Sequence, residues 1–389
     1  MKNHFAAILF FSAVLLCQPA IAAWTVRYVD ASAAGGGDGT TTATSGGTGA
    51  WTLAEAATAS NTSPGMQINI KAGNYSPGAI AFSDDGSAGS PIWFRGYNTT
   101  PGDCDAFDGA LPTLPAIDMS TNQLSCTGAY NWFSGLNVTG ATTTANGQVL
   151  INDVDHLMWN CKVACTAANS NGRALTVASS GTGSRFMNVL FTATTTASVM
   201  VQITPVSVSL SGCVFRGSSI GISTAGETTI ARCIFDDQSS HAIQCSVDAN
   251  VSQCSIYSPG GDGIRLLSTA GSGEIRNNIF ESCGAYAVNS SAGTVASVLI
   301  VHNGYYNSTT ADLNGVVESQ QIGDVSLASS PFTNAASDDF TLTSGTTAKG
   351  AGAPGYVVDI NNIGYPDLGA LQTEAGGSNT YSRSRVVNQ

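Results

Sequence analysis

Four polar or aromatic side chains recur at one position of a repeating pattern, and they are the first candidates for chemistry. In the stretches CVFRG, CIFDD, CSIYS and NIFES this position is occupied by Arg216, Asp236, Tyr257 and Glu281. Two carboxylic acids facing one sugar can act as acid and base in glycoside hydrolysis. We expect Asp236 and Glu281 to be the catalytic pair. Tyr257 and Arg216 are the expected substrate-binding residues: Tyr257 would stack on a sugar ring, and Arg216 would also hold Asp236 ionised.

The same row also fits a surface without chemistry. Charged and aromatic side chains on an outer face first of all keep a protein soluble, and an exposed pair of Arg216 with Asp236 contributes little energy. Several other carboxylates could form pairs as well: Asp84, Asp85, Asp103, Asp105, Asp108 and Asp237. The cluster DCDAFD at 103–108 fits either a calcium site or a long loop, and both interpretations stay open.

Short strands that repeat along the chain position this row. We call the aligned residues the register positions, and they are spaced by 20 to 28 residues: Leu136, Cys161, Val189, Cys213, Cys233, Cys254, Asn278 and Asn303. The residue three places before each register position is apolar, and so is the residue two places after it. A further short apolar strand follows in most units, for example VMVQI, IGIS, HAIQC and DGIRLL. This spacing is typical of solenoids.

Each unit therefore holds about three short strands and no helix long enough for a crossover, so each strand must pair with its equivalent in the next unit. The pattern predicts an all-β chain folded as a right-handed parallel β-helix, with coils about 4.8 Å apart. The stretch AWTLAEAATA, at 50–59, is the one amphipathic helical pattern. We expect it to form a short N-terminal capping helix, because an open first coil would expose strand edges.

Cysteine occupies four of the register positions, and asparagine takes the same place in two later units. Stacked free thiols, disulfides between some neighbours, or a metal site could explain this ladder. We favour stacked thiols, because metal sites need clustered ligands with short spacing and usually histidine nearby. Cys104 and Cys126 lie outside the ladder, and in an oxidising compartment we expect a disulfide between them.

The start of the chain predicts export. Residues 1–22 combine Lys2, an apolar run and a small-residue AIA ending, which is typical of a removed signal peptide. A lipoprotein signal ending at Cys17 is the alternative, but Leu16 is bulky where such signals have a small residue. We expect a secreted, extracellular or periplasmic protein without a membrane span. Its parts would be a cap with the first coils at 23–110, the repeats at 111–310, a closing segment at 311–372 and a flexible tail at 373–389.

The charge of the chain limits its partners. The sequence has 14 Lys and Arg against 26 Asp and Glu, a formal net charge of −12, which becomes −13 when Lys2 leaves with the signal peptide. Such a surface repels nucleic acid and other polyanions. We expect no nucleic-acid partner, no metal and no cofactor.

Both ends of the chain resemble a known group of proteins. YVDASAAGGGDG, GAWTLAEAATA, PGMQINIKAGNY and SPIWFRGYN near the start, with DDFTLTSGTTAKGAGAP and GYPDLGALQ near the end, are similar to secreted members of the pectate-lyase-like superfamily. The resemblance spans roughly residues 27–372 and implies the β-helix fold. It does not imply one activity, because the scaffold carries lyases, hydrolases, epimerases and inert spacers. The calcium-binding acids and arginine base of pectate lyases are not recognisable, and of the polygalacturonase motifs only the pair Asp236 and Asp237 remains.

We therefore expect a secreted β-helix protein whose outer face binds an extended polysaccharide or cell-surface glycan. The low content of positive residues favours a neutral polymer. If the protein is an enzyme, it is a polysaccharide-active glycoside hydrolase or lyase. The alternative is a structural or adhesive protein in which the β-helix is a rigid rod without catalysis.

Overall fold

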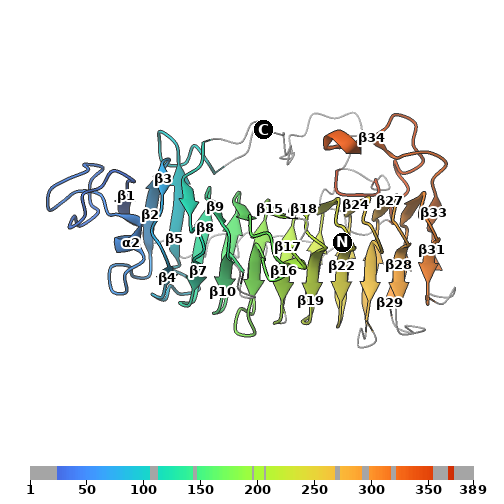
Figure 1. Ribbon diagram of the computed structural model, residues 1–389, viewed down its shortest axis with the longest axis horizontal. Helices are drawn as coiled ribbons and strands as arrows, with labels where there is room; N and C mark the ends of the chain where they lie inside the picture. Colours follow the sequence, from blue (N-terminus) through green and yellow to red (C-terminus); the bar gives the residue numbers. More distant parts are fainter. Residues whose placement is uncertain are drawn as a thin grey trace, which may run out of the picture.

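The computed structural model describes residues 24–105, 113–142, 147–194, 197–205, 207–267, 272–290, 298–316, 321–353 and 367–371. Their strands stack side by side into one elongated parallel β-helix (Figure 1). The expected signal peptide, the expected tail and Asp108 lie outside the described residues. In the part of the chain that is described, no helix is long and apolar enough to cross a bilayer.

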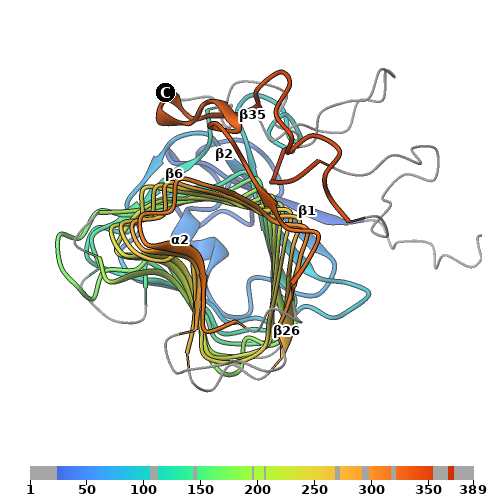
Figure 2. The ribbon, with the colours of Figure 1, turned by 90° about the vertical axis from the view of Figure 1, so that its right-hand side faces the viewer.

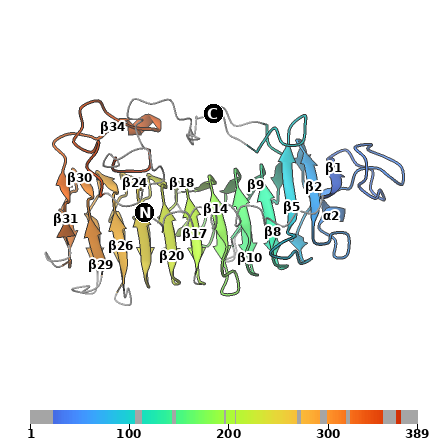
Figure 3. The ribbon, with the colours of Figure 1, turned by 180° about the vertical axis from the view of Figure 1, so that it is seen from behind.

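Three long parallel sheets form the walls of the coil. The 12-stranded sheet is called sheet A. In Figure 3 its strands β17, β20, β26 and β29 follow one another in this order along one wall, with β23 between β20 and β26. Its members are β1 (Thr25–Val29), β2 (Met66–Lys71), β5 (Ile92–Tyr97), β8 (Asn131–Ser134), β11 (Leu157–Trp159), β14 (Arg185–Met187), β17 (Val208–Ser211), β20 (Thr228–Ala231), β23 (Ala249–Ser252), β26 (Gly273–Arg276), β29 (Val298–Val301) and β32 (Gln321–Ile322).

The other two walls are sheet B, with 11 strands, and sheet C, with 10. Sheet B contains β3 (Asn74–Tyr75), β6 (Ala116–Asp118), β9 (Asn137–Gly140), β12 (Lys162–Cys165), β15 (Leu190–Ala193), β18 (Val214–Gly217), β21 (Ile234–Asp236), β24 (Ser255–Tyr257), β27 (Ile279–Glu281), β30 (Gly304–Tyr306) and β33 (Val325–Ser326). Sheet C contains β4 (Ile80–Phe82), β7 (Leu124–Cys126), β10 (Val149–Ile151), β13 (Leu175–Val177), β16 (Val199–Ile203), β19 (Ile220–Thr224), β22 (His241–Cys245), β25 (Ile264–Leu266), β28 (Tyr286–Ser290) and β31 (Ala311–Asn314). The predicted parallel β-helix is confirmed.

A corner of one left-handed residue explains the repeat in the sequence. The residue directly before each register position has φ between 50° and 65°, in the series Gly135, Asn160, Asn188, Gly212, Arg232, Gln253, Asn277 and His302. This conformation is uncommon outside glycine and turns the chain sharply in a single step. The corner carries the chain from sheet A to sheet B. Every register position therefore begins the same turn in its own coil.

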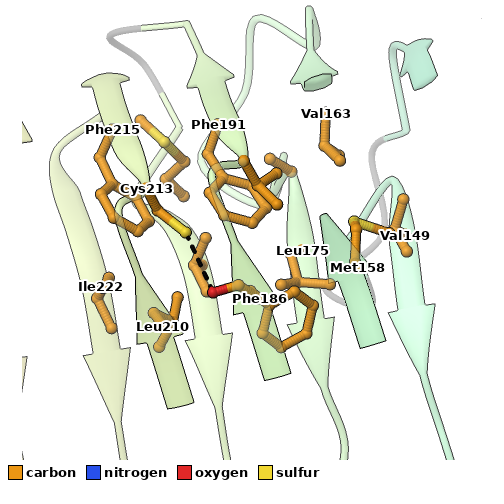
Figure 4. Packing of buried hydrophobic residues seen from close by; sticks show 14 of the residues in the cluster. Val149, Met158, Val163, Leu175, Phe186, Phe191, Leu210, Cys213, Phe215 and Ile222 are labelled. Carbon is orange, nitrogen blue, oxygen red and sulfur yellow. Dashed lines mark hydrogen bonds between the residues drawn. The ribbon is translucent and has the colours of Figure 1, made fainter. Parts of the chain in front are cut away.

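Apolar side chains from all three sheets fill the coil, as the alternation predicts. The residues two places after the register positions stack on one another. Phe215 lies 5.3 Å from Phe191 and 4.6 Å from Phe235 between ring centroids, with interplanar angles of 16° and 6°. Figure 4 shows Phe191 and Phe215 inside the coil, facing Leu210 and Ile222 from the other walls. Burial of such rings is a main source of stability in a sheet-based core.

The cysteine ladder lies inside this core as free thiols. All nine described cysteines are buried and unbridged. The thiols of Cys161, Cys213, Cys233 and Cys254 approach carbonyl oxygens of the previous coil at 3.8, 3.5, 3.8 and 3.8 Å. Figure 4 shows the contact that Cys213 makes with Phe186. Burial raises the pKa of the Cys161 thiol to about 12, so it stays protonated and can donate. The interpretation as stacked thiols is confirmed.

The expected disulfide between Cys104 and Cys126 is wrong, because both residues are free. Cys126 ends strand β7 of sheet C, and its thiol is in the apolar core of the coil. Cys104 lies in the turn after β5, where its thiol contacts the carboxylate of Asp103 at 3.4 Å. The two cysteines therefore occupy different parts of the coil wall.

Thiol titration checks the ladder directly. We expect protein unfolded in denaturant without reductant to react with several equivalents of a thiol reagent, because the stacked cysteines form no bridge. A reduced sample provides the total number of thiols as a control. Finding at most one reactive thiol in the unreduced sample would contradict the free ladder.

The capping helix predicted over 50–59 is not supported. Helix in this range is limited to α2 (Leu53–Ala56), a single turn of four residues. The side chains of Thr58 and Asn61 donate to the carbonyl oxygens of Ala54 and Glu55 at 2.9 and 2.8 Å. These bonds occupy the acceptors that a further helical turn would need, so the helix ends.

A C-terminal hairpin lies on the outside of the coil. It consists of β34 (Phe332–Asn334), the 3-10 turn η2 (Ala335–Ser337) and β35 (Asp339–Leu342), with β34 antiparallel to β35. Viewed along the coil axis, this segment lies over the wall that contains β6, a strand of sheet B (Figure 2). Its Phe332, Phe340 and Leu342 share an apolar cluster with residues of sheet B. The outer face of sheet B is thus covered in the C-terminal coils.

Candidate functional site

The predicted row lies on the outer face of sheet B, in the order that the repeat implies. Arg216 pairs with Asp236, Asp236 with Tyr257, and Tyr257 with Glu281 on the neighbouring strands β18, β21, β24 and β27. Side chains alternate along these strands, so the residue before each member points into the core. The row is therefore continuous, with the two carboxylates on either side of the tyrosine.

Although the row lies on the outer face of the coil, both of its carboxylates are buried. Asp236 is only 9% exposed and Glu281 only 6%. Ser330 donates a hydrogen bond of 3.0 Å from Oγ to Glu281 Oε2, and the ring of Phe340 packs edge-on to Tyr257 with centroids 6.0 Å apart. The physical reason is the C-terminal hairpin, which covers this part of sheet B.

Apolar side chains on the outer face explain why the hairpin docks there. Directly after the register positions, Val214, Ile234 and Ile279 point out of the coil and are nevertheless buried, together with Phe332 and Phe340 of the hairpin. Outward apolar residues in several adjacent coils make a surface that must be covered. The polar row borders this surface and is buried along with it.

Arg216 does not hold Asp236 ionised as predicted. Its guanidinium lies 3.5 Å from Asp236 Oδ2 and 2.5 Å from Asp338 Oδ1, so it is shared between two carboxylates. Burial first, and then the neighbours Asp237 and Asp338, raise the pKa of Asp236 to about 7, although Arg216 acts in the opposite direction. Burial likewise raises the pKa of Glu281, partly offset by the hydrogen bond from Ser330. The row contacts the hairpin through Arg216, Tyr257 and Glu281, and the hairpin covers its two carboxylates.

A second polar row runs along the outer face of sheet C. Its members pair in register across six neighbouring strands: Gln202, Ser223, Gln244, Arg265, Asn289 and Asn314. With strands about 4.8 Å apart, these residues span about 24 Å along the coil. The C-terminal hairpin lies on sheet B and leaves this wall uncovered (Figure 2). Amide and hydroxyl groups in such a line can hydrogen-bond an extended polar polymer.

A histidine adjoins this row at the start of β22. His241 Nε2 lies 2.8 Å from Nη1 of Arg265, and His241 Nδ1 lies 3.5 Å from Oδ2 of Asp262. The same carboxylate oxygen accepts a bond of 2.9 Å from Asn289, whose own oxygen accepts one of 2.9 Å from Asn314. Four consecutive coils therefore join in a single network, which we call the His241 network.

The imidazole of His241 is held neutral in this network. Burial lowers the pKa of His241; Asp262 opposes this effect, and Arg265 adds to it. Arg265 can only donate, so Nε2 accepts from it. Nδ1 faces two groups of Asp262: the backbone amide, which donates to it at 3.1 Å, and the carboxylate at 3.5 Å. A Cβ atom on Gly261 would come within 3.2 Å of the ring, so only glycine allows this close approach of the turn. The ring is thus fixed with one basic nitrogen on the side of Arg265.

Two atoms of the His241 network lack hydrogen-bond partners within the described part of the chain. They are Oδ1 of Asp262, a residue that is 3% exposed, and Nε of Arg265. Buried polar atoms are nearly always paired, so an unpaired one indicates a missing partner such as water or a ligand. The network has both a donor and an acceptor to offer an incoming polar molecule.

The sequence contained signals for this network that the repeat analysis did not use. HAIQC and DGIRLL were identified as core strands, and their outward positions, Gln244 and Arg265, were not aligned with each other. His241 and Asp262 stand at the ends of these stretches, in turns whose geometry varies between coils. Aligning the third strand of each unit would have identified the row, although not the contact between His241 and Asp262.

The acidic cluster at 103–105 stabilises a loop. Asp103 accepts hydrogen bonds from the backbone amides of Asn98, Thr99 and Thr100 at 2.8, 2.7 and 3.0 Å, and Asp105 forms an ion pair with Arg95. Within the described ranges, no three His, Cys, Asp or Glu side chains are grouped so that they could hold a metal ion. Of the two interpretations of this cluster, these contacts favour the loop.

Comparisons with known proteins agree with the fold. No family model matches the chain, and no curated protein sequence matches it either. Among solved structures, pectate lyase Pel9A superimposes with a TM-score of 0.68 at 14% identity, covering 91% of this chain and 98% of that one. A rhamnogalacturonan lyase superimposes with a TM-score of 0.53 at 13% identity, covering 79% and 90%. The resemblance to the pectate-lyase-like β-helix is thus confirmed at the level of the fold.

Proposed function

We propose that the protein binds a polysaccharide containing uronic acid along the outer face of sheet C and cleaves it by β-elimination. The observation that carries this proposal is the contact between the neutral His241 and Arg265, 2.8 Å apart, within a polar row of six strands. The names of the structural neighbours, a pectate lyase and a rhamnogalacturonan lyase, support a polysaccharide as ligand. We favour sheet C over a neutral glycan on sheet B, because the hairpin buries Asp236 and Glu281 on sheet B.

The network supplies the groups that elimination requires. A base must take the proton next to the sugar carboxylate, and a cation must stabilise the negative charge that develops there. A carboxylate that draws the guanidinium of Arg265 away from His241 would free Nε2 to accept that proton. The glycosidic C–O bond then breaks, a double bond forms in the sugar, and the leaving oxygen takes a proton from water. Asp262 keeps the resulting imidazolium oriented and stabilised.

The negative net charge of −12 does not exclude such a ligand. At physiological ionic strength the field of distant charges is screened over about 8 Å, so a contact with Arg265 outweighs the average charge of the molecule. The net charge does predict slow association at low salt. We therefore expect modest affinity that depends on a few direct contacts.

A panel of acidic and neutral polysaccharides tests this function. We expect an acidic polymer to yield products with the ultraviolet absorbance of an unsaturated sugar, and Arg265→Ala to weaken its binding by about tenfold. The control is Thr229→Ala, an exposed change on sheet A. New reducing ends without that absorbance would indicate hydrolysis. Binding without cleavage would indicate a recognition or adhesive protein. Either outcome would overturn the elimination.

A further inference from the structure

Two carboxyl groups meet where the C-terminal hairpin contacts sheet B. Asp338, at the end of η2, lies 2.5 Å from Nη2 of Arg216, and Asp236 lies 3.5 Å from Nε of the same guanidinium. The two carboxyl groups thus share one guanidinium, and Asp236 is only 9% exposed. A buried carboxylate beside a second one is unfavourable when ionised. The junction is therefore most favourable while Asp236 holds a proton.

We infer that Asp236, Arg216 and Asp338 form a pH-sensitive latch, which holds the C-terminal hairpin on sheet B while Asp236 is protonated and loosens when Asp236 ionises. Asp236 belongs to the coil, in strand β21, and Asp338 belongs to the hairpin. Ionisation of Asp236 thus acts directly on the contact between the two elements.

The surrounding charges make full ionisation unfavourable. Asp237, next to Asp236, is exposed and adds a negative charge near the pair. From β24 and β27, Tyr257 and Glu281 face the same junction, and Glu281 is bonded to Ser330. Asp339 follows Asp338 but binds the backbone and hydroxyl of Thr341. Arg216 is the cation that both carboxylates of the pair contact, and one positive charge cannot neutralise two negative ones.

The direction of the pH effect follows from the two states of Asp236. Burial under the hairpin raises its pKa to about 7, whereas in a lifted hairpin the carboxyl meets water and returns toward about 3.9. A proton is therefore bound more tightly in the closed state, and its stabilising effect is lost as pH rises between these values. In that window the ratio of closed to open molecules is expected to fall about tenfold per pH unit.

The apolar contacts set how far the hairpin opens. The contacts of Phe332, Phe340 and Leu342 with the outer face of sheet B favour the closed hairpin equally at any pH, because the free energy of burying apolar area does not depend on ionisation. The latch shifts the equilibrium between the closed and the open hairpin, and the apolar contacts determine where that equilibrium lies without the latch. Opening would expose the row of Arg216, Asp236, Tyr257 and Glu281 to solvent. Ligands could then reach this face of sheet B when the hairpin is open.

Hydrogen exchange of the full-length protein tests the latch. Amides in 332–342 are expected to lose protection, after correction for the intrinsic rate, by up to about tenfold per pH unit between about pH 5 and about pH 7. Amides of β20, in sheet A, serve as an internal control and should keep their protection. Protection of the hairpin that does not change over this range would overturn the proposal.

Matched variants assign the effect to the pair. Asp236→Asn keeps the shape and a donor but cannot ionise, so protection of the hairpin should become independent of pH. Asp338→Asn should weaken the pH dependence, because Arg216 is then left to Asp236 alone. This variant decides the question if Asp236→Asn disturbs the local fold. Asp339→Asn, in the same turn, should leave the pH dependence unchanged. An unaltered pH dependence in both Asp236→Asn and Asp338→Asn would rule the latch out.

Discussion

Turnover of an acidic polysaccharide is expected to fall by about a hundredfold or more when His241 is replaced by alanine, because the proton acceptor is removed. The melting temperature should change little, since the ring lies at the edge of sheet C, outside the core cluster. The pH profile gives an independent readout. Because burial lowers the pKa of His241, its basic form persists below the usual range, and activity should be lost only in more acidic solution.

The variant Asp262→Asn tests whether Asp262 positions His241, as distinct from the proton transfer by His241 itself. The amide preserves the shape of the side chain but removes the charge that faces His241 Nδ1, so we expect a smaller loss of turnover and a further downward shift of the acidic limb. A purely structural role of Asp262 would lower stability without moving the pH profile. Thr229→Ala, on the opposite wall, again serves as the control.

Catalysis by the row on sheet B is the competing hypothesis. If Asp236 and Glu281 are the acid and base, Asp236→Asn and Glu281→Gln should each lower turnover by about a hundredfold, while His241→Ala leaves it within about threefold. Both carboxylates are buried under the hairpin, so these changes also act on its contacts. Their effect on turnover must therefore be compared with hydrogen exchange of 332–342. Loss of activity without loss of protection would favour the row on sheet B.

The sequence predicts the coil well because the coil is built from local features. The left-handed residue at the corner, the apolar residue before it and the aromatic residue after it lie within one short stretch of each unit. Residues such as Phe186, Asn188 and Phe191 therefore define one wall and the turn to the next by themselves. Stacking of equivalent residues then follows from the repeat alone.

The covering of sheet B could not be predicted in the same way. The hairpin at 332–342 packs on residues as far back as Ile279 and Val214, 53 and 118 residues before Phe332, and no repeat relates them to it. A signal was nevertheless present in Val214, Ile234 and Ile279, which point outward from the coil and are apolar. Outward apolar residues in successive coils indicate a covering element, and the polar row beside them should have been expected to share its burial.

The expectation for the N-terminal helix failed for a local reason. The pattern at 50–59 has helical periodicity, but Thr58 and Asn61 bind carbonyl oxygens that a longer helix would need. Such side chains compete with the backbone and favour turns. Periodicity alone does not reveal this competition.

The asparagines of the ladder make more hydrogen bonds than the cysteines. We therefore expect the largest loss of stability when one of these asparagines is replaced. Asn278 Nδ2 donates to the carbonyl oxygen of Val251 at 3.0 Å, as Cys254 Sγ does to that of Ile230 at 3.8 Å. Asn278 Oδ1 also accepts the backbone amide of Cys254 at 2.8 Å. A thiol reproduces the first bond weakly and offers little to the second, because sulfur is a weak acceptor.

Asn278→Ala is therefore expected to lower the free energy of unfolding by about 3 kcal/mol, because a buried amide and a buried carbonyl lose their partners at about 1–3 kcal/mol each. Asn278→Cys should cost less, since the thiol can still donate to Val251. Urea titration under reducing conditions measures both, and Asn250→Ala, an exposed position of β23, should change stability by no more than about 0.5 kcal/mol. If Asn278→Cys were as destabilising as Asn278→Ala, the thiols of the ladder would be apolar fillers without a hydrogen-bonding role. A loss below about 1 kcal/mol for Asn278→Ala would mean that water takes over both bonds inside the coil.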